Sequence, residues 1–129
     1  MEEVARGVPD SLRQLIEKHI ERLAEEEQRL LEVASVVGVT FSAATVAAGL
    51  QIEAEAVDQQ CETLARTGHF LRSQGIEEWP DGTVGGQYSF LHALYQQGLY
   101  ERVTEARRVR IHRRIGEQKA TAYGERARE

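Results

Sequence analysis

Residues 69–91 read HFLRSQGIEEWPDGTVGGQYSFL, and this stretch holds both segments of the chain that we expect to form strands. The aromatic-containing segments 69–72 and 88–91 favour extended structure. Between them lie Trp79-Pro80-Asp81-Gly82 and Gly85-Gly86, which are typical turn residues. The pattern predicts a β-hairpin with a long tip, so strands should be few and should come late in the chain.

Four helices are expected before this hairpin, each from apolar residues that recur at helical spacing. They begin at Asp10, near Ala24, after the cap residue Ser42, and at Glu53. Gly38 and Gly68 are placed to end the second and fourth helices. The residues expected to face the core are Leu12, Leu15, Ile16, His19, Ile20, Leu23, Leu30, Leu31, Ala34, Val37, Val46, Ala47, Leu50, Val57, Cys61, Leu64 and Ala65.

Two further helices are expected after the hairpin. One runs from about His92 to Val103, and a last one starts at Thr104 and carries Ile111 and Ile115 among several arginines. Three helices followed by a two-stranded hairpin is the layout of a winged helix. We therefore expect a mostly α fold, with a winged-helix domain and its leading helix over 1–103 and the start of a C-terminal helical region over 104–129.

Composition and charge restrict the function. The 129 residues, 41% hydrophobic and 29% charged, fit one soluble globular domain. The net charge of -5 is distributed as -7 over 1–66, -2 over 67–100 and +4 over 101–129. An acidic body with a basic C-terminal helix argues against a protein whose main task is to bind nucleic acid phosphates.

The predicted helix from Glu53 to Thr67 would be the DNA-reading helix of a winged helix. Its exposed side offers Glu53, Glu55, Asp58, Gln59 and Glu62, with Arg66 as its one basic residue. Gln59 and Gln60 are able to read adenine, but the carboxylates would be repelled by phosphates. DNA is therefore an unfavoured partner, although a DNA-binding winged-helix regulator stays the alternative function.

Other function classes are also disfavoured. No metal-binding set, nucleophile beside a base, or phosphate-cradling glycine loop appears, so we expect no metal, no bound cofactor and no catalysis by this chain alone. Glu2 and Glu3 stand where a secretory signal would be basic, and the single Cys61 has no disulfide partner. We expect a cytoplasmic protein. The long uncharged stretch 33–52 is expected to form two short core helices with a break rather than a membrane span.

Six segments, taken in order, carry a resemblance to a known family. They are 8–12 VPDSL, 27–38 EQRLLEVASVVG, 41–42 FS, 79–84 WPDGTV, 88–100 YSFLHALYQQGLY and 111–117 IHRRIGE. Together they resemble the region that follows the ATPase core in bacterial signal-transduction ATPases of the STAND type. The match spans nearly the whole chain and rests on the order and spacing of the segments.

The resemblance implies a regulatory role without catalysis. In that family a winged helix packs on the nucleotide-binding core and leads into tetratricopeptide-like repeats, often with a cyclase, kinase or DNA-binding module elsewhere. ATP or ADP would then be bound by the parent protein, and the partners would be the adjacent ATPase core and the repeat domains. Homo-oligomer formation stays open, and a plain dimerisation module is a third function to test.

The resemblance also assigns a role to His92. The segment Phe90-Leu91-His92-Ala93-Leu94 is similar to a Met-His-Asp-type motif whose histidine contacts the β-phosphate of bound ADP. Ala93 departs from that motif, which often has aspartate there. The start of a helix favours an anion, which agrees with this nucleotide-sensing role. The alternative is a helix-capping or partly buried structural histidine.

Four residues are candidates for contact with a partner. Trp79 at the hairpin tip would be an exposed anchor, unless it folds back over its own hairpin. Arg107, Arg108 and Arg110 belong to an arginine set that surrounds the last helix rather than forming one stripe. They would be solvated, bind nucleic acid, or pair with acids of the ATPase core or of this chain.

Overall fold

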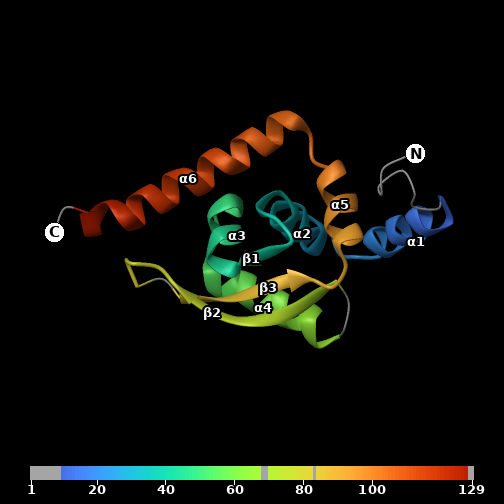
Figure 1. Ribbon diagram of the computed structural model, residues 1–129, viewed down its shortest axis with the longest axis horizontal. Helices are drawn as coiled ribbons and strands as arrows, with labels where there is room; N and C mark the ends of the chain where they lie inside the picture. Colours follow the sequence, from blue (N-terminus) through green and yellow to red (C-terminus); the bar gives the residue numbers. More distant parts are fainter. Residues whose placement is uncertain (1–9, 68–69, 83, 128–129) are drawn as a thin grey trace.

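The computed structural model describes residues 10–67, 70–82 and 84–127. Within them the chain forms six helices and one three-stranded antiparallel sheet (Figure 1). In chain order the elements are α1 Asp10–Glu21, α2 Glu25–Val37, β1 Thr40–Ser42, α3 Ala43–Leu50, α4 Ala54–Arg66, β2 Leu71–Glu78, β3 Val84–Phe90, α5 Ala93–Glu101 and α6 Glu105–Ala127. The prediction of a mostly α fold is confirmed.

The sheet has the strand order β1-β3-β2, and α4 packs against β2 and β3. Helices α2 and α3 lie between the sheet and α6, which crosses the molecule on the other side (Figure 1). Helix α1 packs on α5 at the opposite end of the molecule from the far end of α6. The second and third helices are therefore the centre of the fold.

The ends of the central helices follow from local chemistry. Gly38 ends α2 with φ of 148°, a backbone conformation that favours glycine. The Ser42 hydroxyl accepts a hydrogen bond from the Thr45 N–H at 3.1 Å and so caps α3, as its sequence position predicts. The expected break within 33–52 is confirmed. Gly68, predicted to end α4, lies outside the described residues.

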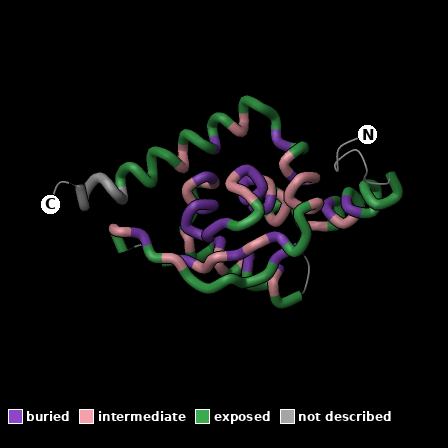
Figure 2. Tube along the Cα trace, in the orientation of Figure 1, coloured by how far each residue is buried: buried purple, intermediate pink, exposed green. Residues whose placement is uncertain are grey.

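The core is concentrated in α2 and α3, with further buried residues in β1 and β3, whereas most of β2 is exposed (Figure 2). Its largest fully buried side chains include residues from α1, α2, β2, β3, α5 and α6, so the last helix belongs to the same core as the rest. They are Tyr88, Ile20, Leu30, Leu31, Leu71, Leu99, Ile111 and Val33. The prediction that Leu12 and Leu15 face the core is wrong, because α1 protrudes and buries only Ile16 and Ile20.

One strand was not predicted. Strand β1 pairs with β3 in a register that places Thr40 opposite Ser89 and Ser42 opposite Gln87. It has three residues, too few to show an alternating pattern, and its partner lies almost fifty positions away. The expectation that all strands come late is therefore wrong.

The hairpin is longer and its turn tighter than predicted. Gly85 and Gly86 were expected in the tip, but both lie within β3. A Cβ at Gly85 would be 3.1 Å from the Ala44 nitrogen, so the absence of a side chain lets β3 approach α3. The turn closes with the Gly82 N–H donating to the Trp79 carbonyl at 2.9 Å.

Candidate functional site

His92 is the N-cap of α5. Its exposed side chain uses Nδ1 to accept a hydrogen bond from the Leu94 N–H at 3.2 Å. Because Nδ1 accepts, the neutral imidazole carries its proton on Nε2. The structure thus gives His92 the capping contact of the alternative interpretation, and it leaves an outward N–H that a neighbouring acceptor could use.

The N-terminus of α5 has fewer free donors than the sequence suggested. The Leu94 N–H is bonded to the His92 ring, and the Tyr95 N–H donates to the His92 carbonyl at 3.0 Å. An anion at this helix end would therefore be bound mainly through the imidazole rather than through several backbone N–H groups.

Trp79 is not an exposed anchor. Its side chain is 3% exposed and packs against Ala44 of α3. The indole N–H donates to Oε1 of Glu77 at 2.9 Å, and Nζ of Lys119 on α6 lies 5.9 Å from the ring centroid. The indole is therefore buried within the chain rather than exposed, but it packs on α3 and is bonded to its own hairpin through Glu77.

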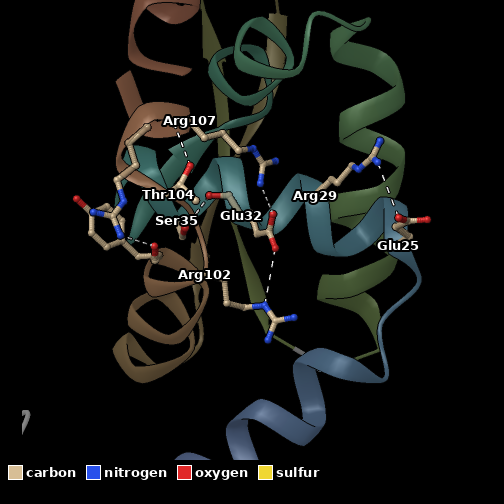
Figure 3. A network of polar contacts seen from close by, with 9 residues as sticks. Glu25, Arg29, Glu32, Ser35, Arg102, Thr104 and Arg107 are labelled. Carbon is tan, nitrogen blue, oxygen red and sulfur yellow. Dashed lines mark hydrogen bonds and ion pairs between the residues drawn. The ribbon is translucent and has the colours of Figure 1, made fainter. Parts of the chain in front are cut away.

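A carboxylate on α2 binds the start of α6 (Figure 3). Oε1 of Glu32 lies 2.6 Å from Nη1 of Arg107, and Oε2 lies 3.8 Å from Nε of Arg102 in the α5–α6 connection. The Glu32 side chain is only 12% exposed, so this ion pair is less screened by solvent than a surface pair. We call these three residues the Glu32 latch.

A second set of contacts holds α6 against α3. Arg114 donates to the Gly49 carbonyl at 3.2 Å, and Ile111 is 1% exposed. A Cβ on Gly49 would lie 2.8 Å from Cγ1 of Val33 and 3.4 Å from Cγ2 of Ile111. Gly49 therefore sets how closely the first half of α6 approaches α2 and α3.

The other arginine candidates differ from each other. Arg108 lies over the Tyr100 ring at 3.8 Å and donates to the Tyr100 carbonyl, so it is fixed within the chain. Its buried Nε has no hydrogen-bond partner in the part of the chain that the structure describes. Arg110 is exposed on the outer side of α6. The arginines are distributed around the helix as predicted, and only Arg110 of the three candidates is fully open to a partner.

The exposed face of α4 is acidic. Glu53, Glu55 and Glu62 are exposed, whereas Asp58 is half-buried because it joins α4 to the sheet. Oδ1 of Asp58 accepts from the Gly86 N–H and from the Tyr88 hydroxyl, both at 2.9 Å. Asp58 was expected on the exposed side of this helix, but its side chain instead holds α4 against β3.

The roles of Glu32 and Asp58 were not predicted from the sequence. Glu32 stands inside the apolar run Leu30-Leu31-Glu32-Val33-Ala34, and a carboxylate there is a signal that could have suggested a buried partner. The sequence could not identify that partner, because Arg107 is 75 residues away from Glu32.

The remaining chemistry is limited. Within residues 10–67, 70–82 and 84–127 there is no group of three histidine, cysteine or acidic side chains placed to bind a metal. No described helix is long and apolar enough to cross a membrane. Burial raises the pKa of the Cys61 thiol to about 12, and the charges of Asp58 and Glu62 add to the rise, so this thiol is not a reactive nucleophile.

Comparison of the chain with protein-family models, with curated proteins and with solved structures finds no match.

Proposed function

We propose that the chain is a non-catalytic regulatory winged-helix domain of a multidomain signal-transduction ATPase. It would pack on the nucleotide-binding core, which binds ATP or ADP, and couple the nucleotide state to a C-terminal repeat region. The element order α2-β1-α3-α4-β2-β3 and the strand order β1-β3-β2 support the winged-helix part of this proposal.

The Glu32 latch is the observation that carries the relay role. It fixes the first turn of a 23-residue helix to α2, and the helix then runs past α3 and the hairpin tip to its far end (Figure 1). A helix of this length spans about 34 Å. A small rotation of the body would therefore become a larger displacement at the far end of α6.

The acidic face of α4 argues against the alternative, a DNA-binding regulator. A helix that enters the major groove must approach phosphates, and Glu53, Glu55 and Glu62 would all be repelled. The exposed Gln59 is the one neutral base-reading side chain beside them. The same face suits contact with a basic protein surface better than contact with DNA.

His92 provides the test. In a longer protein that contains the preceding ATPase region, we would compare His92→Ala with His92→Ser and measure ADP and ATP affinity. Serine keeps a good N-cap for α5 but removes the imidazole, whereas alanine removes both. If His92 senses nucleotide, both variants weaken ADP binding selectively.

If His92 only caps the helix, the serine variant binds ADP like the unmodified protein. The relay would then have to depend on docking contacts alone. The proposal would be rejected if all three proteins had equal nucleotide affinities and the chain also showed salt-dependent DNA binding. That result would favour the alternative, a DNA-binding regulator.

A further inference from the structure

A groove of 530 Å³ runs between α2 and α6, beside the Glu32 latch. Its lining includes the apolar residues Val33, Leu50 and Ile111 and three arginines: Arg29 from α2, and Arg107 and Arg114 from α6. Pockets of this size suit small organic ligands. The presence of three arginines in one lining, in a chain with a net charge of -5, is what distinguishes this groove.

The arginines have more donors than their contacts use. Arg29 lies 3.8 Å from Glu25 through one nitrogen, Arg107 contacts Glu32 through one, and Arg114 donates to the Gly49 carbonyl through one. Each guanidinium has five N–H donors. Glu25 and Glu32 are the two acidic residues in the lining, so three positive charges face two negative ones.

We infer that this groove binds a small phosphate ester. A tetrahedral phosphate presents oxygens in several directions and can accept from more than one arginine fork at once, whereas a planar carboxylate is matched by one. The apolar part of the lining, which includes Leu50, would contact a short organic body. No aromatic side chain lines the groove, so a nucleotide base has nothing there to stack on. This inference does not depend on the proposed function.

The phosphate-ester inference can be tested by isothermal titration calorimetry of the 129-residue chain with glycerol 3-phosphate. The ionic strength is held constant with a chloride salt. Inorganic phosphate, pyrophosphate and ADP serve as comparison ligands. We expect glycerol 3-phosphate to bind saturably with one-to-one stoichiometry. We expect ADP to bind no more tightly than pyrophosphate. An ADP affinity well above that of pyrophosphate would contradict the ligand class.

Arg29→Gln and Arg113→Gln are the matched variants, since both remove one positive charge from a helix surface. Arg29 lines the groove, and Arg113 is an exposed residue of α6 that does not. Losing a charged hydrogen bond should weaken glycerol 3-phosphate binding about tenfold in the Arg29 variant. The Arg113 variant should bind as the unmodified chain does.

An equal loss in both variants would show general charge attraction and would overturn the inference. So would the absence of saturation at about 10 mM ligand, which corresponds to less than about 3 kcal/mol of binding free energy. Thermal melting of both variants confirms that each is folded before titration. Tighter binding of an acidic peptide than of glycerol 3-phosphate would assign the groove to a protein partner instead.

Discussion

Glu32 on α2 and Arg107 on α6 are 75 residues apart in the sequence, and their Oε1 and Nη1 atoms are 2.6 Å apart. The Glu32 side chain is 12% exposed and that of Arg107 is 33% exposed. Removing either partner leaves a partly desolvated charge without its counter-ion. This should lower the free energy of unfolding more than the loss of an exposed pair does. Arg102 only partly compensates, because it lies 3.8 Å from the carboxylate.

Glu32→Gln should therefore destabilise the chain by about 1–2 kcal/mol, measured by urea unfolding. Glu25→Gln is the control, because the Glu25–Arg29 pair is exposed and should contribute less than about 0.5 kcal/mol. A double-mutant cycle of Glu32→Gln with Arg107→Gln should show a positive coupling energy. Additive effects of the two substitutions would mean that the Glu32–Arg107 pair has no interaction energy.

Two glycines should respond in opposite directions to alanine. Gly49→Ala places a Cβ 2.8 Å from Val33 and should cost about 1–3 kcal/mol, because this overlap exceeds the gain in helix propensity. Gly116→Ala on exposed α6 meets nothing within 4 Å and should stabilise by about 0.5–1 kcal/mol.

Chemical denaturation of the two glycine variants, beside the unmodified chain, provides the measurement. Val33→Ala and Gly49→Ala together should cost less than the sum of the two single substitutions, because the smaller side chain makes space for the new methyl group. Stabilisation by Gly49→Ala would show that α6 does not need this close approach.

Stability should fall as the pH rises above 9. The pKa of Cys61 increases from its ordinary value of 9.0 to about 12 in the folded chain, so between these values the unfolded chain releases a proton that the folded chain keeps. Ionisation then favours unfolding by up to about 1.4 kcal/mol per pH unit. Burial and the hydrogen bond to Asp58 also raise the pKa of Tyr88, which acts in the same direction.

Cys61→Ala should flatten this alkaline slope, although it lowers stability at neutral pH through the lost packing. Equilibrium unfolding between pH 8 and 11 compares the two proteins. The unmodified thiol should react with a disulfide reagent only after the chain is unfolded. Rapid labelling of the folded chain at pH 8 would contradict its burial.

The chain should bind duplex DNA no more tightly than an acidic protein of its size, as measured by fluorescence anisotropy at 150 mM salt. Glu55→Lys combined with Glu62→Lys changes the charge of the α4 face by four units and should create salt-dependent binding. Glu105→Lys combined with Glu117→Lys on α6 changes the net charge by the same four units elsewhere and is the control. Specific binding by the unmodified chain would favour the alternative function.

Local patterns predicted most of the helices. Ser42 and Gly38 mark element ends that depend on groups within a few residues, and both were predicted correctly. Leu12 and Leu15 were assigned to the core because they share a face with Ile16. Periodicity defines a helical face, but the partner helix covers only part of the face of α1.

The candidate site was less predictable than the fold. His92 could be placed at a helix start from its neighbours, and its capping contact with Leu94 is local. Trp79 could not be placed, because its environment is supplied by Ala44, which is 35 positions earlier in the chain. Asp58 was assigned to a solvent face, and its contacts with Gly86 and Tyr88 depend on how α4 lies on the sheet.

The sequence by itself determined the helical character, the acidic face of α4 and the arginine-rich surface of α6, because propensity, spacing and charge are properties of neighbouring residues. Only the tertiary structure decided that β1 joins the sheet, that Glu32 holds α6, and that Arg29, Arg107 and Arg114 share one groove. These features join segments distant in the chain. Their free energy depends on burial and close contact, which exist only when the chain is folded.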